Sequence, residues 1–259
     1  GMRYNSALAE MRRRIIENDE FNLYSQEEKI DNGDAVGLAG NLRLHFRQWP
    51  REWQTQPWCA SRCEGGPCRE VGTHFFSALI DFASGNSSIS SSAIQKQQCA
   101  PLTARIKATV SYPDDSDNTT CEDSAFGTLE FMGGALPPGG LTIEMSVMTD
   151  KRLEKDIYEL SIGSSSGGGN NDDALTLFDF CSLRKERTGH VLVQNADYGR
   201  RECVDALVSA AFRNKANRKN DDDKAQSLSI VTAQDGRKAQ RLLDAILESQ
   251  GAWINIDVS

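Results

Sequence analysis

Apolar and polar residues alternate along the middle of the chain. In residues 102–110 every second residue is apolar, and a shorter alternating run occupies residues 41–47. Phe126, Leu129 and Phe131 suggest another short strand. A period of two places successive side chains on opposite faces of a strand, so that one face is buried and the other meets water. These segments therefore predict strands of a sheet with one wet face.

The strongest alternation lies in residues 139–163, GGLTIEMSVMTDKRLEKDIYELSIG. Two alternating runs flank a charged tip, which predicts two strands that pair as an antiparallel hairpin. Residues 175–181 predict a further strand after a Ser/Gly/Asn/Asp stretch. Consecutive strands without helices between them indicate an antiparallel sheet and an α+β domain.

Helical spacing of apolar residues marks three other segments. We expect helices at residues 6–22, 201–214 and 235–250, each with an apolar stripe at spacings of three and four. Residues 73–83 are apolar enough for either a helix or a strand. Residues 228–233 either form a strand or begin the last helix, so residues 225–250 are one helix or a strand followed by a helix.

Charge is concentrated in the middle third of the chain. The whole chain of 259 residues has a net charge of −8, and residues 76–183 contain 6 basic and 15 acidic residues, a difference of −9. A surface of this sign attracts basic proteins and disfavours direct binding of nucleic acid. The acidic residues in the two expected loops are candidate binding residues, unless they only confer solubility: Asp114, Asp115, Asp117, Glu122, Asp123, Asp172 and Asp173.

One segment suggests a metal site. Cys59, Cys63 and Cys68, with His74 beyond them, lie in a Trp-, Cys- and Ser-rich segment at about residues 48–100. Thiolate and imidazole groups are common zinc ligands, but the spacings here differ from the usual C-x2-C. The alternative is an insertion loop with free thiols. Seven scattered cysteines indicate a reducing compartment.

Other catalytic signals are weak. Three histidines are present, and none stands in a recognisable Cys–His or nucleophile-elbow motif, so a thiol enzyme is only an alternative hypothesis. Residues 33–40 are glycine-rich, but no strand leads into them and no Lys-Ser/Thr follows. We therefore expect no cofactor. No apolar stretch reaches the roughly 20 residues that a membrane span needs, so no stable membrane insertion is expected.

The second half of the chain resembles the mitochondrial acidic matrix protein (mitochondrial glycoprotein) family, also known as the complement- and hyaluronan-binding matrix protein family. The similar segments are the expected hairpin, ALTLFDFCSLRKE, HVLVQNADYGRRECVDALVSAAF and AQSLSIVTAQDGRKAQRLLDAILESQG. The resemblance implies a single α+β domain over residues 1–259, interrupted by the insertion at about 48–100. Its fold would be a twisted antiparallel sheet of about seven strands, flanked by N-terminal and C-terminal helices.

The same resemblance implies a function without catalysis. The protein would be a homotrimeric acidic adaptor of the mitochondrial matrix, chaperone-like, that binds basic proteins and supports mitochondrial translation or respiratory maintenance. Its presequence is not visible in this sequence. The zinc-containing interaction module and the thiol enzyme are the alternatives.

Overall fold

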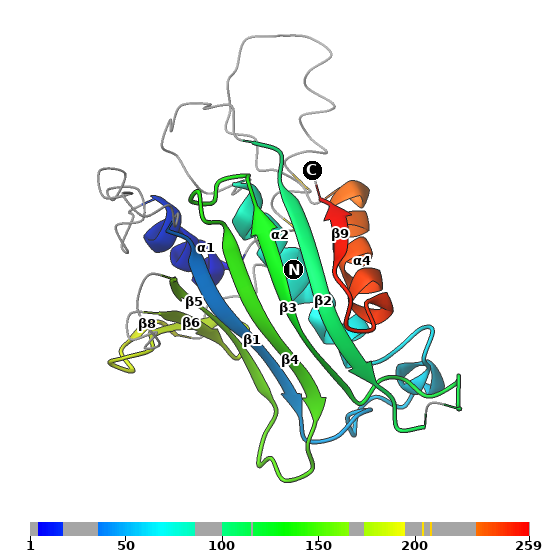
Figure 1. Cartoon of the computed structure of the whole chain (residues 1–259). Helices are drawn as coiled ribbons and strands as arrows, with labels where there is room; N and C mark the ends of the chain where they lie inside the picture. Colours follow the sequence, from blue (N-terminus) through cyan, green and yellow to red (C-terminus); the bar gives the residue numbers. More distant parts are fainter. Residues whose placement is uncertain are drawn as a thin grey trace.

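A strongly curved sheet with helices on one face dominates the computed structural model (Figure 1). The structure describes residues 5–17, 36–85, 100–114, 116–165, 174–194 and 232–258, together with Val204 and Val208. The strands are β1 (Leu38–Phe46), β2 (Thr103–Ser111), β3 (Ser124–Met132), β4 (Leu141–Thr149), β5 (Ile157–Ser164), β6 (Leu175–Phe178), β7 (Ser182–Lys185), β8 (Val191–Val193) and β9 (Ile254–Asp257).

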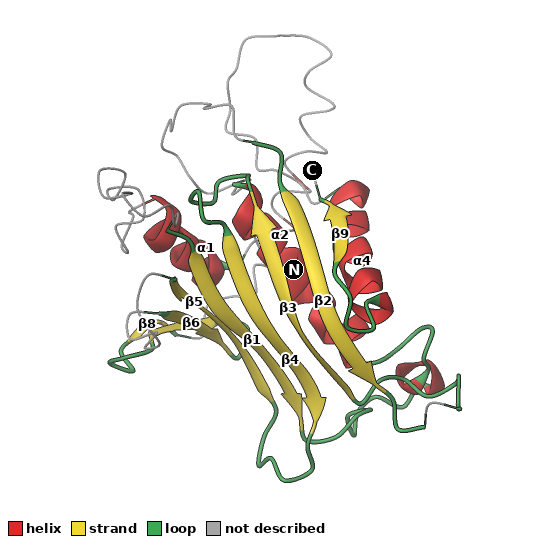
Figure 2. Ribbon diagram, viewed as in Figure 1, coloured by secondary structure: helices red, strands yellow, loops and turns green. Residues whose placement is uncertain are grey.

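The described helices pack on one side of this sheet (Figure 2). They are α1 (Ser6–Arg12), continued by the π-helical turn η2 (Arg13–Glu17); the π-helical turn η5 (Cys68–Gly72), which leads directly into α2 (Thr73–Ser84); and α4 (Ala233–Glu248). A separate 3-10 turn, η4 (Pro57–Ala60), lies in the connection between β1 and η5.

The sheet is mixed, with strand order β8-β7-β6-β5-β1-β4-β3-β2-β9. Strand β1 lies between β4 and β5, and it runs parallel to β4 and antiparallel to β5. Leu42 of β1 is paired with Met145 on one side and with Leu160 on the other. The prediction that residues 139–163 form a hairpin is therefore wrong, although both of its arms are strands.

The predicted fold class is wrong for a related reason. We expected an antiparallel sheet of about seven strands with helices flanking it, whereas the described part of the chain has nine strands, one parallel pair and helices on one face. Alternation identifies which residues form strands, but it carries no information about which strands become neighbours. Residues 150–156, which connect β4 to β5, pass the end of β1, a strand from much earlier in the chain.

A hydrophobic core joins the helices to the inner face of the sheet. In α2 the residues Phe75, Phe76, Leu79 and Phe82 are almost fully buried, at the spacing that a helix face requires. The inner residues of β1 alternate with its outer ones, and Phe46 at its end has no exposed surface. Each such side chain contributes about 1.5–3 kcal/mol to stability when it leaves water, so the core holds α2 firmly against the sheet.

The segment 48–72, which was expected to be part of an insertion, packs against the sheet. The indole nitrogen of Trp49 donates a hydrogen bond to the Cys59 carbonyl at 3.0 Å, and Cys59 and Cys68 are buried. The apolar run at 73–83 is helix α2. Cys68 belongs to the hydrophobic core and Trp49 packs against it, so residues 48–72 pack with the sheet, and α2 after them supplies much of the core.

The other helix predictions have mixed outcomes. The first helix extends to Glu17 in the described residues, and the last begins after Thr232, which forms a capping box with Asp235. Most of residues 201–214 and all of residues 225–231 lie outside the described residues. In the part of the chain that the structure describes, no helix has the length and apolarity to cross a membrane.

Candidate functional site

The sequence predicted two separate sites, which lie against each other in the structure. One is the cysteine-bearing turn, Cys59 to Cys68, and the other is the acidic loop, residues 113–123. The backbone N–H of Arg62 donates to the Thr119 carbonyl at 2.9 Å, and that of Cys121 donates to the Ala60 carbonyl at 2.8 Å. The Arg62 guanidinium also lies 3.5 Å from the ring centre of Tyr112. The two segments therefore form one packed unit beside the sheet.

The candidate acidic residues do not share one environment. Asp114 and Asp117 accept hydrogen bonds from Ser116 and Thr119, their own neighbours in the loop. Hydrogen bonds from Thr119 and Thr120 lower the pKa of Asp117 to about 2. Asp123 is exposed, and Asp115, Asp172 and Asp173 lie outside the described residues.

Glu122 differs from the other acidic residues because it is buried, with 2% of its surface exposed. Its carboxyl group accepts a hydrogen bond from the backbone N–H of Cys68 at 2.9 Å. Burial raises the pKa of Glu122. It is thus a structural contact of the cysteine-bearing turn and does not contribute to an exposed acidic surface.

The structure does not assemble the expected metal site. Cys59 and Cys68 are buried, Cys63 is exposed, and His74 lies on the first turn of α2. Among the described residues, no group of three or more His, Cys, Asp or Glu side chains is arranged to hold a metal ion. The zinc hypothesis therefore has no geometric support in this part of the chain.

The buried thiols are also poor nucleophiles. Burial raises the pKa of Cys59 and Cys68, and it raises that of Cys121 to about 12. A thiol enzyme needs a thiolate, which a lowered pKa would favour. The thiol-enzyme hypothesis gains no support from these three residues.

A different group of polar residues gathers between the end of β1 and the start of α2. We call it the Arg51 cluster, and it consists of Arg51, Gln54, Glu70, His74 and Tyr158. Arg51 and Gln54 follow β1, Glu70 lies in η5, His74 lies in α2, and Tyr158 lies in β5. Three segments that are distant in sequence therefore meet at this place.

Arg51 connects the members of the cluster. Its Nε donates to Gln54 Oε1 at 3.1 Å, and one terminal nitrogen donates to the Tyr158 hydroxyl at 3.4 Å. The other terminal nitrogen lies 3.9 Å from Glu70 Oε2. The guanidinium also stacks over Trp49 and Trp53, at 5.0 and 4.5 Å from their ring centres. These contacts hold a positive charge in a fixed orientation.

The carboxyl group of Glu70 is enclosed by protein. Gln54 Nε2 donates to Oε2, whereas the buried Oε1 accepts no N–H or O–H among the described residues. The Cys59 thiol lies beside this carboxyl group: after burial, the charge of Glu70 and a hydrogen bond to it help to raise the pKa of Cys59. Buried polar atoms are normally paired, by protein or by water. Oε1 is therefore a buried acceptor inside the cluster, and the Cys59 thiol is a nearby donor to this carboxyl group.

His74 lies four residues after Glu70, so the two residues occupy the same side of the helix. Its side chain keeps an exposed edge, yet the surrounding protein desolvates the imidazole and lowers the pKa of His74, and the positive charge of Arg51 acts in the same direction. The lowered pKa favours the neutral imidazole, whose free ring nitrogen can accept a hydrogen bond or a proton.

Aromatic rings pack around Tyr158, the cluster residue that lies in β5. The ring centre of Tyr158 lies 5.7 Å from that of Phe46 and 4.7 Å from that of Phe180, which is 5.2 Å from Phe75. Burial, followed by the hydrogen bond to Asp156, raises the pKa of Tyr158 to about 12. A hollow of about 270 Å³ opens beside the cluster, and Arg51 is the one cluster residue that lines it. Arg51 thus combines rigid support with access from this hollow.

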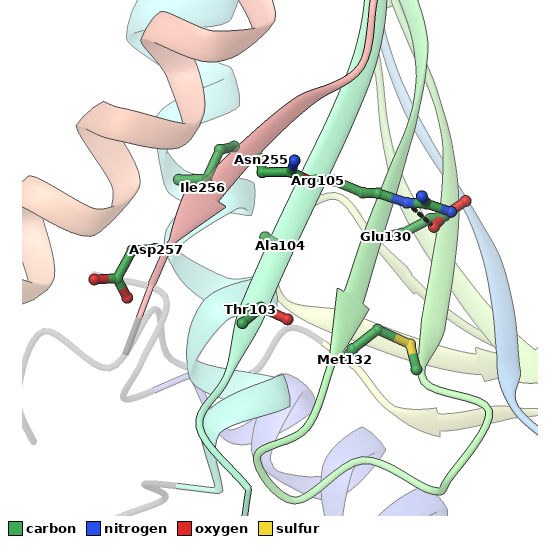
Figure 3. Close-up of a pocket in the computed structure, with 8 residues that line it drawn as sticks. All are labelled: Thr103, Ala104, Arg105, Glu130, Met132, Asn255, Ile256 and Asp257. Carbon is green, nitrogen blue, oxygen red and sulfur yellow. Dashed lines mark hydrogen bonds and ion pairs between the residues drawn. The ribbon is translucent and has the colours of Figure 1, made fainter.

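A second hollow, of about 580 Å³, lies at the sheet edge formed by β3, β2 and β9 (Figure 3). Arg105 forms an ion pair with Glu130 there at 2.5 Å. These two charges already satisfy each other, and the labelled residues include no histidine or cysteine. This hollow is a weaker candidate than the Arg51 cluster.

The described glycines do not form a dinucleotide-binding loop. In such a loop the glycines follow a strand and open a helix, whereas Gly37 precedes β1 and Gly40 lies within it. Gly65 and Gly66 do precede the helical segment, but the carboxyl group of Glu122 already accepts the N–H of Cys68 there. The N–H group of Cys68 is therefore already bound to Glu122 and is not free to bind a phosphate.

Of the cluster residues, only His74 was predicted from the sequence, and as a zinc ligand. Arg51, Gln54, Glu70 and Tyr158 were missed. The available signal was the spacing of Glu70 and His74, which becomes meaningful once residues 68–84 are recognised as continuous helix. Arg51 and Tyr158 join the cluster only through the tertiary fold.

Comparison with known proteins identifies the domain. The model of the oxidoreductase family C-terminal alpha/beta domain matches residues 38–256. Gal80p from Saccharomyces cerevisiae, in a super-repressor mutant, is 15% identical, with a TM-score of 0.54 over 100% of this chain and 64% of that chain. An oxidoreductase domain protein from Kribbella flavida is 15% identical, with a TM-score of 0.51 over 96% of this chain and 63% of that chain.

The two solved structures support a conclusion about the fold and nothing further. At 15% identity the two structures show the fold alone, and this chain spans less than two thirds of their length. No curated protein matches the chain.

The expected membership of the mitochondrial acidic matrix protein family is wrong, because the family model that matches is a different one. The non-enzymatic matrix adaptor that rested on that resemblance is wrong with it.

Proposed function

Because this chain belongs to the oxidoreductase family whose C-terminal alpha/beta domain it matches, we propose that the Arg51 cluster binds the substrate of an oxidoreductase. The observation that carries the proposal is the place of Arg51, which lines a hollow, lies 3.9 Å from the Glu70 carboxyl group and is near enough to the exposed His74 to act on its pKa after desolvation. Together Arg51 and His74 provide a donor for a substrate oxygen and a base for its proton.

The cluster accounts for the proton half of such a reaction. When a secondary alcohol becomes a ketone, the carbon loses a hydride and the hydroxyl oxygen loses a proton. A neutral His74 accepts that proton, and Arg51 holds the oxygen-bearing part of the substrate. The hydride goes to an electron carrier, for which the described residues form no recognisable binding loop.

The test is turnover by the protein in its full-length natural form. A panel of small hydroxyl and carbonyl compounds is screened with a nicotinamide dinucleotide as the hydride carrier. His74→Asn should lower kcat by about 10²–10⁴-fold, as the loss of a general base does. His190→Asn is the matched control, because His190 is exposed at the β7–β8 turn, outside the cluster. Equal effects of both substitutions would overturn the proposal.

A second candidate is a regulator without turnover, because the super-repressor mutant of Gal80p has the same fold over the whole of this chain. The same screen separates the two functions. Binding that depends on Arg51 and His74, with no turnover of any bound compound, supports the regulator.

A further inference from the structure

Glu122 is far from the Arg51 cluster in sequence, but it contacts the segment that carries two cluster residues. It lies in the connection between β2 and β3, and its carboxyl group accepts the N–H of Cys68, the first residue of η5. Glu70 and His74 lie two and six residues further along the same helical segment.

Gly66 shows how closely this carboxyl group packs. Its φ is +102°, a conformation that glycine adopts readily. A Cβ at this position would lie 2.4 Å from Glu122 Oε2 and 2.7 Å from Oε1. The turn before η5 therefore fits the carboxyl group only because residue 66 has no side chain.

We infer that Glu122 is a positioning residue, which fixes the beginning of η5 and through it the places of Glu70 and His74. This inference rests on the proposed role of the cluster. A buried carboxyl group normally costs stability, so its presence here requires a specific contact, and the N–H of Cys68 supplies one.

The groups around Glu122 define what else can respond to its removal. The N–H of Cys68 and the positive charge of Arg69 favour the ionised form against burial, and Cys121 lies beside it. A neutral glutamine keeps a carbonyl acceptor of the same shape, whereas alanine removes the acceptor.

The experiment follows the imidazole of His74 by NMR over a pH series, in the folded protein and without any ligand. Glu122→Ala should move the titration midpoint of His74 upward by about half a pH unit or more, because the ring leaves its desolvated place. Glu122→Gln should produce a smaller shift, because the acceptor for Cys68 is kept. The midpoint of His190 should stay unchanged in both variants.

If Glu122→Ala does not fold, Glu122→Asp replaces it, because a side chain shorter by one methylene cannot hold the same contacts. An unchanged His74 midpoint in the folded variant would overturn the inference. This outcome is separate from failure of the proposed function, because the titration needs neither substrate nor turnover.

Discussion

The acidic loop at residues 113–123 and the Arg51 cluster both contain several charged side chains, but the partners of these side chains differ. In the loop, Asp114 and Asp117 bind hydroxyl and N–H groups of their immediate neighbours. In the cluster, Arg51 bridges β5 and η5, which are distant in sequence. The loop backbone is also packed, against the segment around Cys59–Cys68, but its exposed carboxylates bind only residues next to them. A functional site brings together side chains from separate elements on a rigid scaffold, and of these two groups of charges only the cluster does so.

The largest expected effect comes from removing the support of the cluster. Phe75 is fully buried and packs near Phe180, so Phe75→Ala should lower the free energy of unfolding by about 3–5 kcal/mol. Denaturant unfolding measures this change. Ser77→Ala in the same helix is the control, and a loss below about 1 kcal/mol for Phe75→Ala would show that the helix is not held as described.

A smaller effect is expected from Arg51→Lys. Lysine keeps the charge but loses the planar fork that contacts Gln54, Tyr158 and Glu70 together, which should cost about 1–2 kcal/mol of stability. Arg152→Lys is the matched control, because Arg152 pairs with Asp150 at the surface and should show no measurable change in the same unfolding experiment. Equal behaviour of the two variants would contradict the central place of Arg51.

Two residues of the acidic loop should respond to pH in opposite directions. Glu122 has a raised pKa, so the native state binds its proton more tightly, and wild-type stability falls relative to Glu122→Gln as pH rises above 4.5. Asp117 has a pKa of about 2 against an ordinary 3.8, so wild-type stability falls relative to Asp117→Asn as pH drops below 3.8. Unfolding curves over a pH series measure both differences, and slopes of the same sign would refute the assignment.

The smallest effect is expected from neutralising the exposed part of the loop. Asp114→Asn combined with Asp117→Asn should leave turnover and ligand affinity unchanged, because the hydrogen bonds of both residues stay within the loop. A loss of turnover comparable to that of His74→Asn, or a clear loss of affinity, would identify the loop as a binding surface.

Much of the secondary structure was predictable from the sequence, because alternation marks β2, β3, β4 and β5 within a few residues. The neighbour order was not, since the insertion of β1 between β4 and β5 leaves no trace in local periodicity. The cluster was missed for a related reason: Arg51 and Tyr158 are 107 residues apart and meet only in the folded chain.

The homotrimer, the matrix location and the basic partners stay untested predictions. The first two have lost the resemblance that supported them, because the chain matches another family.

The most direct test of the central claim is a crystal structure of the protein with a compound that the screen identifies. We expect the compound at the Arg51 cluster, with a hydroxyl or carbonyl oxygen within hydrogen-bond distance of His74 and Arg51. A compound bound at the acidic loop or at the edge hollow of Figure 3, with His74 and Arg51 untouched, would contradict the account.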